Sequence, residues 1–317
     1  MAFVFILAGV ATALTSCGDS PATSRDGTST SQGRTTTSQG GTTTSQGRTT
    51  TSPPLAAAPR GEMAAPAGYT RQQIIFDDTF SGTTLNTSNW TPELAPGSRW
   101  DSEHLGAPYS SGGPDQAAYW APSQVTVDNG LTLAARQTTQ SDIGYSRGFN
   151  WVSGVVTSTF TLPSTGWYVQ ISAKMPDTSG GMWPALWFLP SSSFQEFDGF
   201  EGGWQGPSPN EQGHSDFFTG NGQQDEVWPT PSGTDITAGY NTYGFQYIPG
   251  QSVTVYFNGQ QAYQVLASNG STISAQAYYL LIELQVATPQ VAHHTVATNA
   301  TPSASMKVAE VQVYNIQ

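Results

Sequence analysis

Residues 182–201, MWPALWFLPSSSFQEFDGFE, join an aromatic apolar run to three carboxylates. Side chains alternate between the faces of a β-strand, so Glu196 and Asp198 would point one way and Glu201 the other. One bulged residue between them returns Glu201 to the first face. Gly199 tolerates the left-handed backbone that one common kind of bulge requires. The stretch therefore predicts a bulged strand that carries three acids in a row on one face.

Paired carboxylates of this kind suit sugar chemistry. Retaining glycosidases place two of them about 5 to 5.5 Å apart, one to attack the anomeric carbon and one to protonate the leaving oxygen. The alternative is a solvated strand on which three acids have no function. Trp183 and Trp187 precede the acids, and sugar rings stack on such aromatic surface. The aromatic neighbours favour the catalytic interpretation.

The motif W-P-A-x-W-x-L-P followed by E-x-D-x-x-E resembles the signature of glycoside hydrolase family 16, and further similar segments extend the resemblance over residues 70–317. It implies an all-β, concanavalin A-like jelly-roll sandwich with a concave sugar-binding cleft. It also implies that Glu196 is the nucleophile and Glu201 the general acid/base. Asp198, between them, would hydrogen-bond the nucleophile.

The strand pattern agrees with an all-β fold. Short alternating runs recur, for example on both sides of Asp128-Asn129-Gly130 and before Asn258-Gly259. Period-two alternation with Asn-Gly turns indicates antiparallel hairpins. No stretch has the pattern of a long amphipathic helix, which favours a β-sandwich.

Several aromatic residues and one histidine are candidates for substrate binding. Trp183 and Trp204 flank the acids in the sequence, and Trp100 and Trp120 lie in loops rich in glycine and proline, where the walls of a binding site tend to be built. His214 could bond to the Asp198 region or to a substrate hydroxyl. For each of them the alternative is a structural role.

The N-terminal part predicts export. Residues 1–17 resemble a lipoprotein-type signal peptide, since an apolar run ends in Leu-Thr-Ser-Cys with Cys17 as the residue to be lipidated. A plain secretion signal is the alternative, and no Lys or Arg precedes the apolar run. Residues 18–68, rich in Thr, Ser, Gly and Pro, predict a disordered linker. The catalytic domain would then be residues 69–317, at the cell surface on a lipid anchor in a bacterial membrane, or extracellular.

Charge limits the partners. Residues 69–317 hold 19 acidic and 6 basic residues, which disfavours nucleic acid and anionic lipid surfaces. We expect a monomer that contacts a membrane only through the N-terminal anchor. The histidines lack metal-ligand spacing, so no metal site is expected in catalysis and no cofactor is required. The family resemblance leaves open a structural calcium ion, with Asp77 or Asp78 as candidate ligands.

The combined prediction is a retaining endo-β-glycanase that hydrolyses a neutral polysaccharide, β-1,3- or mixed β-1,3-1,4-glucan, by double displacement. A transglycosylase that remodels cell-wall glucan is one alternative. A non-catalytic lectin-like sandwich is another, and a polysaccharide lyase a third, which the scarcity of basic residues disfavours.

Overall fold

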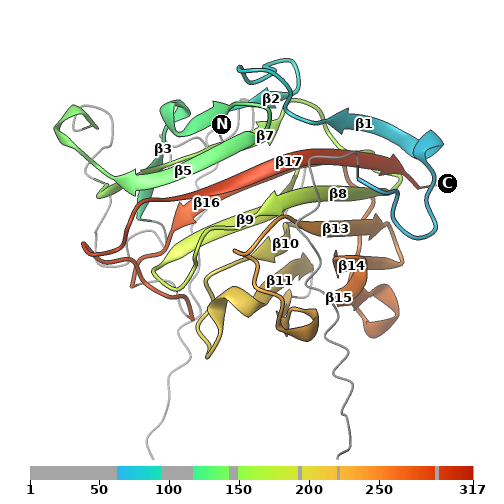
Figure 1. Cartoon of the computed structure of the whole chain (residues 1–317). Coiled ribbons are helices and arrows are strands. Elements are labelled where there is room, and N and C mark those ends of the chain that lie inside the picture. The colour runs from blue at the N-terminus through green and yellow to red at the C-terminus, as the bar shows by residue number, and fades with distance from the viewer. Residues whose placement is uncertain are drawn as a thin grey trace, which may run out of the picture. The chain divides into compact units, whose positions relative to one another are not determined.

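The computed structural model describes residues 63–93, 117–142, 149–191, 195–219, 222–289 and 293–316. These ranges form two β-sheets packed face to face, and the all-β jelly-roll prediction is confirmed (Figure 1). The described helices are short 3-10 turns: η1 (Arg71–Gln73), η2 (Pro122–Gln124), η3 (Gln140–Asp142), η4 (Pro209–Glu211), η5 (Pro231–Gly233) and η6 (Ala267–Asn269). In the described part of the chain, none is long and apolar enough to cross a bilayer.

The larger sheet has ten strands in the described ranges, eight of them in the order β15–β14–β13–β8–β17–β5–β6–β3. Strand β1 pairs with β17, and β4 pairs with β5. Their bounds are β1 (Ile74–Asp78), β3 (Ala118–Trp120), β4 (Val125–Val127), β5 (Leu131–Gln137), β6 (Trp151–Ser153), β8 (Trp167–Lys174), β13 (Asn241–Ile248), β14 (Ser252–Phe257), β15 (Gln260–Leu266) and β17 (Ala304–Asn315).

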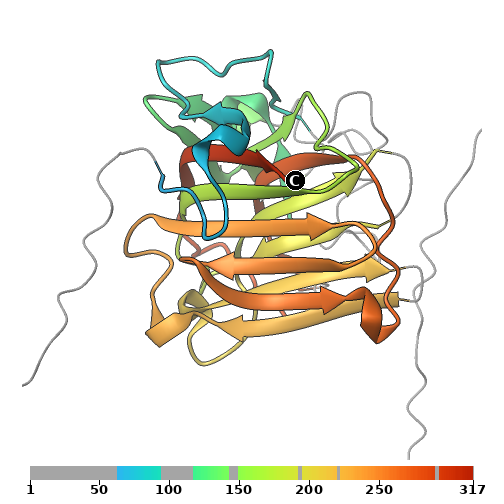
Figure 2. The same ribbon diagram turned by 90° about the vertical axis from the view of Figure 1, so that its right-hand side faces the viewer.

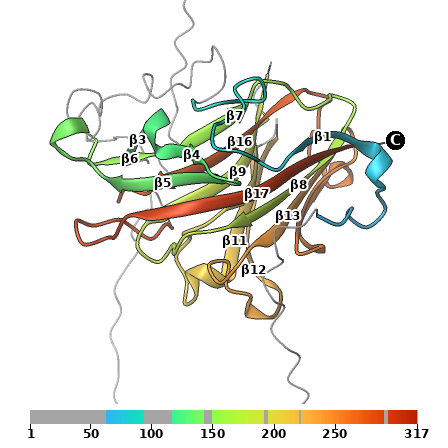
Figure 3. The same cartoon turned by 45° about the horizontal axis from the view of Figure 1, so that its top comes forward.

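The smaller sheet has seven described strands in the order β12–β11–β10–β9–β16–β7–β2, and it carries the acidic motif. Their bounds are β2 (Trp90–Thr91), β7 (Val155–Ser158), β9 (Met182–Pro190), β10 (Phe197–Glu201), β11 (Gln212–Thr219), β12 (Gly222–Pro229) and β16 (Tyr278–Val286). Strands β13 to β15 of the larger sheet form one layer in front of the strands of the smaller sheet (Figure 2). Seen from above, β5, β17 and β8 run across β16 and β9 (Figure 3).

One predicted turn shows how the sequence directs this topology. Asn258 and Gly259 both take positive φ, 49° and 77°, in the two-residue connection between β14 and β15. That conformation is the type I′ turn, whose twist matches antiparallel strands and which Asn-Gly favours.

The space between the sheets is filled by aromatic side chains. Phe188 of β9 stacks on Phe197 of β10 with ring centroids 5.2 Å apart, and Phe245 of β13 meets both edge-on at 5.3 and 6.3 Å. All three are fully buried, so their packing holds β9 and β10 against the opposite sheet. Because these residues occupy the inner face, the polar side chains of the motif lie on the outer face of the smaller sheet.

The packed region begins before the expected boundary at residue 69. The Met63 backbone N–H donates to Glu310 Oε2 at 2.9 Å, and the side-chain amide of Gln170 donates to the Ala64 carbonyl at 2.9 Å. Residues 63–68, assigned from the sequence to the linker, are therefore bonded to the sandwich. The expected signal peptide, with Cys17, and the remainder of the expected linker lie outside the described residues.

Candidate active site

A β-bulge at Gly199 brings the motif acids to one face. Along β9, Trp187 pairs with Asp198 and the adjacent Leu186 pairs with Phe200, which leaves Gly199 as an extra residue on β10. The register against β11 shifts at the same place. Phe200 then turns into the core, and Glu201 joins Asp198 on the outer face. The bulge predicted from the spacing is present.

The reason for glycine at this position differs from the expectation. Gly199 is not among the residues with positive φ, so the left-handed bulge expected from the sequence is wrong. A Cβ at Gly199 would instead lie 2.4 Å from Cδ1 of Phe245 and 3.1 Å from the Leu186 carbonyl oxygen. Glycine is required because the bulged backbone presses directly on an aromatic ring of the opposite sheet.

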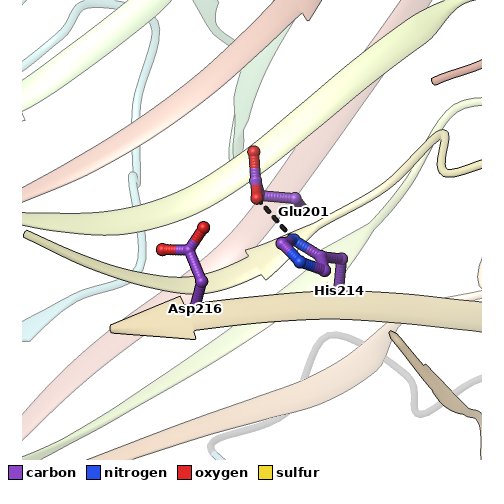
Figure 4. Close-up of side chains that lie close together, drawn as sticks. All are labelled: Glu201, His214 and Asp216. Atoms are coloured by element: carbon purple, nitrogen blue, oxygen red, sulfur yellow. Dashed lines mark hydrogen bonds and ion pairs between the residues drawn. The ribbon is translucent and has the colours of Figure 1, made fainter. Parts of the chain in front are cut away.

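Two aromatic side chains hold the carboxylate of Glu201. The indole N–H of Trp183 donates to Oε1 at 2.8 Å, and Nδ1 of His214 lies 2.8 Å from Oε2 (Figure 4). His214 is fully buried and Glu201 is 8% exposed. An imidazole nitrogen can donate to a carboxylate or accept from a carboxylic acid. The contact therefore serves both protonation states that an acid/base residue passes through.

Asp198 lies directly opposite Asp216 of β11, and both side chains are buried. Burial, followed by the charges of Asp216, Glu196 and Glu201, raises the pKa of Asp198 well above its usual range. Burial also raises the pKa of Asp216. Two neighbouring buried carboxyl groups do not both ionise readily, so this pairing favours retention of a proton by one of them.

Glu196 stands at the entrance of β10 and is half-buried. Its carbonyl accepts the Phe218 N–H at 3.0 Å. The neighbouring Gln195 accepts the Ser274 N–H with its side-chain oxygen and the Tyr278 hydroxyl with its backbone carbonyl. These hydrogen bonds position Glu196. The charge of Glu196 acts on Asp198 and on Glu283 of β16.

The motif did not point to Glu283, a fifth carboxyl on this face. It accepts the indole N–H of Trp187 at 3.1 Å, and burial raises its pKa to about 8, to which the charges of Glu201 and Glu196 contribute. The signal in the sequence was a single acid inside the apolar run 278–286. Trp183 and Trp187 are both partly exposed on this face, as their spacing predicts.

Trp204 lies beside the acids but is covered by histidine rings. The rings of Trp204 and His214 stack with centroids 3.7 Å apart, and His293 lies nearly parallel to the indole at 5.9 Å. His294, which the sequence did not suggest, contacts both Trp183 and Trp204, and burial lowers its pKa to about 4. Trp204 therefore supports His214, and a role as an open sugar platform stays a prediction.

Trp120 and Trp100 were the other two tryptophans predicted to bind substrate. Trp120 is 3% exposed and packs with Val155, Leu189 and Leu281 on the outer face of the smaller sheet. Its position there favours a structural role over a sugar platform. Trp100 lies outside the described residues.

Residues of the types that bind metals gather at one place in the described ranges. Donor atoms of Glu201, His214 and Asp216 lie within 4.8 Å of one another. Glu201 and His214 bond to each other, and Asp216 accepts the side-chain amide of Gln223, so we interpret the group as a hydrogen-bonded network and assign no metal there.

The calcium prediction concerns a different region. The carboxylate of Asp78 accepts N–H groups of Phe80, Asn89 and Trp90, so the polypeptide already supplies its donors. Asp77 accepts the side-chain amide of Gln312 at 3.3 Å. Calcium binding stays a prediction.

The fold and this face define a jelly-roll β-sandwich with an acidic, tryptophan-lined site on its smaller sheet. Over 125 residues the chain is 32% identical to "Endo-1,3-1,4-beta-glycanase ExsH" of Rhizobium meliloti (strain 1021), which covers 37% of this chain and 26% of that protein. It is 28% identical over 185 residues to "Endo-1,3-1,4-beta-glycanase EglC" of the same organism, which covers 53% and 37%. The chain thus spans well under half the length of these curated relatives.

Solved structures share the fold. An endo-beta-1,3-glucanase from Pyrococcus furiosus matches with a TM-score of 0.60 and 20% identity, covering 76% of this chain and 94% of that one. SCLam, described as a non-specific endo-beta-1,3(4)-glucanase from family GH16, matches with a TM-score of 0.63 and 19% identity, covering 80% and 94%. No family model matches the chain. In sequence the chain is similar to endo-1,3-1,4-beta-glycanases, and in fold it is similar to glucanases that include a member of glycoside hydrolase family 16, the family that its motif resembles.

Proposed function

We propose that this protein is a retaining endo-β-glucan hydrolase. The observation that carries the proposal is the bulge at Gly199, which sets Asp198 and Glu201 side by side on the outer face. Glu196 directly precedes their strand, and its charge contributes to the raised pKa of Asp198. A nucleophilic carboxylate and a proton donor on one face are the groups that double displacement requires.

In the first step the Glu196 carboxylate attacks the anomeric carbon while Glu201 gives its proton to the glycosidic oxygen. The carbon–oxygen bond to the leaving sugar breaks, and a glycosyl ester forms on Glu196. In the second step Glu201 takes a proton from a water molecule that attacks the same carbon, and the Glu196 carboxylate is released. Two inversions leave the anomeric configuration unchanged. Trp183 and His214 hold Glu201 in place through both steps.

A neutral β-glucan is the substrate that we infer, with β-1,3 or mixed β-1,3-1,4 linkages. The two curated relatives are named as endo-1,3-1,4-beta-glycanases, and SCLam is described as an endo-beta-1,3(4)-glucanase. The excess of acids over bases disfavours a sulfated or uronic polymer, which requires cationic groups for binding. Trp183 and Trp187 offer partly exposed rings for sugar stacking.

The test is the release of reducing ends from β-1,3-glucan and mixed-linkage glucan by the full chain, with the anomeric form of the first product read by proton NMR. We expect Glu196→Gln and Glu201→Gln each to lower kcat by about 10³-fold or more. Glu226→Gln, an exposed residue of β12, is the matched control and should retain activity. A Glu196→Gln enzyme with wild-type activity, or an inverted first product, would refute the proposal.

The alternatives are outcomes of the same assay. Products longer than the added oligosaccharide would indicate glycosyl transfer. Oligosaccharide binding without reducing ends, unchanged by Glu196→Gln, would indicate a lectin. A product that absorbs in the ultraviolet would indicate a lyase.

We further propose that the protein acts outside the cell, held at the surface by lipid on Cys17. The apolar run before Cys17 and the polar tract after it support this proposal. Cys17→Ala should move the protein from the membrane fraction to the medium. Recovery of both forms in the medium would contradict lipid anchoring.

A further inference from the structure

Asp216 is a carboxyl that the acidic motif does not contain. It lies on β11, its Cα pairs with that of Asp198 on β10, and it is 5% exposed. Figure 4 places it next to Glu201 and on the same strand as His214. A buried acid on the strand beside the motif requires a physical explanation, because an isolated buried carboxylate is costly.

The two oxygens of Asp216 have different surroundings. Oδ2 accepts the side-chain amide of Gln223 at 2.6 Å. Oδ1 is buried and meets no N–H or hydroxyl donor among the described residues. The cross-strand neighbour of Asp216 on this face is Asp198, which is also buried. Two neighbouring carboxyl groups can bond to each other only when one of them carries a proton.

Among the described residues, the charges that act on this pair come from no lysine or arginine. The ionisable side chains that face the pair or its neighbours are Glu196, Glu201, His214, Asp225, Tyr263, Glu283 and His294. The two imidazoles are the basic groups of this set. A shared proton therefore removes a negative charge that no lysine or arginine of the described residues offsets.

We propose that Asp216 is a positioning residue, which shares one proton with Asp198 across strands β10 and β11 and so keeps Asp198 uncharged between the two catalytic glutamates. The inference rests on the proposed function, since it assigns Asp216 a role in the same site. While Glu196 is a carboxylate, it competes with Asp216 for the proton on Asp198. When Glu196 becomes a sugar ester its charge is lost, and the proton is then held by Asp198 and Asp216 alone. No proton enters or leaves the pair in the cycle.

Two substitutions should move the pH dependence of kcat/KM in opposite directions. Asp216→Asn removes the negative neighbour, so Asp198 loses its proton at lower pH, and the alkaline limb should shift down by about one pH unit or more. Gln223→Ala removes the amide that stabilises the Asp216 carboxylate, so the pair holds its proton more tightly and the limb should shift up. Gln223 is exposed on β12, so this variant leaves the packing between the sheets unchanged. Glu226→Gln is the matched control and should leave the profile unchanged.

A double variant separates proton sharing from a structural role. In an Asp198→Asn background, adding Asp216→Asn should produce no further shift of the alkaline limb, because the shared proton is already absent. Overlapping profiles for wild type and Asp216→Asn, or a uniform loss of kcat without a shift, would overturn the proposal. Shifts of the same sign for Asp216→Asn and Gln223→Ala would also overturn it.

A second readout does not depend on activity. Infrared difference spectra of the full chain at neutral pH should show a protonated carboxyl band that both Asp198→Asn and Asp216→Asn change and Glu226→Gln retains. If the wild type releases no reducing ends, the proposed function fails while this measurement still tests the proton pair. If the band is the same in Asp216→Asn as in the wild type, the pair fails while the hydrolase proposal stands.

Discussion

Adding a single methyl group at Gly199 should disturb both the stability and the active site of this protein. An alanine Cβ would lie 2.4 and 2.5 Å from two ring carbons of Phe245. Phe245 is fully buried and contacts Phe188 and Phe197, so its ring has little room to move. The strain must be shared between the core and the bulge that carries Glu201.

The expected cost can be scaled from the packing. Overfilling a well-packed core costs about 1–3 kcal/mol, and a contact this short suggests the upper half of that range, about 2–3 kcal/mol. In a domain of this size each kcal/mol lowers Tm by about 2–4 °C, so Gly199→Ala should lower Tm by about 4–12 °C. A shift of Glu201 by a fraction of an ångström should also lower kcat at least about tenfold.

Thermal unfolding of the full chain, followed by circular dichroism, measures the fall in Tm. The rate of reducing-end release measures the fall in kcat. Gly180→Ala is the matched control, because Gly180 has no positive φ and its nearest contact would be a threonine methyl at 3.3 Å. Phe245→Leu removes ring atoms from the clash, so the double variant should be less destabilised than the sum of the single variants. A Tm for Gly199→Ala within one degree of wild type, or equal to that of Gly180→Ala, would refute the reasoning.

The other predictions concern the carboxyl groups that accept the indole N–H groups of Trp183 and Trp187. Trp183→Phe keeps a ring against His294 but removes the hydrogen bond to Glu201, and should lower kcat/KM by about 10- to 100-fold; an unchanged value would show that the bond does not position the acid. Burial raises the pKa of Glu283 to about 8 from an ordinary 4.5. The free energy of unfolding should therefore be highest below about pH 4.5 and fall as the pH rises through 8. Glu283→Gln, which still accepts from Trp187, should flatten this fall in urea unfolding, and parallel curves for the two proteins would contradict the assignment.

Local patterns were enough to predict the all-β class, several of the strands, one tight turn and the existence of the bulge. The spacing E-x-D-x-x-E is out of phase with a regular strand, so a common face requires an extra residue. The reason for glycine was not available from the same stretch. It depends on Phe245, which lies 46 residues further along the chain and in the other sheet. The inference from glycine to a left-handed backbone was therefore wrong, although the bulge was predicted.

The residues that contact the acids were also predicted from the sequence only in part. Trp183 was a candidate from the sequence as a substrate contact, and His214 as a partner of the Asp198 region or of a substrate hydroxyl, whereas both bond to Glu201. Asp216, Glu283 and His294 were missed. Each is a polar residue in a strand or loop distant from the motif, and its position next to the acids follows from strand pairing.

The amino-acid sequence by itself determined the β-sandwich class and the three acids with their order, because side-chain alternation and turn preferences act over a few neighbouring residues. Only the tertiary structure decided which groups surround those acids: the proton partner of Asp198, the indole and imidazole on Glu201, and the ring that excludes a side chain at Gly199. Antiparallel register and sheet packing join residues that are far apart in the chain, and the electrostatics of a buried carboxyl depend on those neighbours in space.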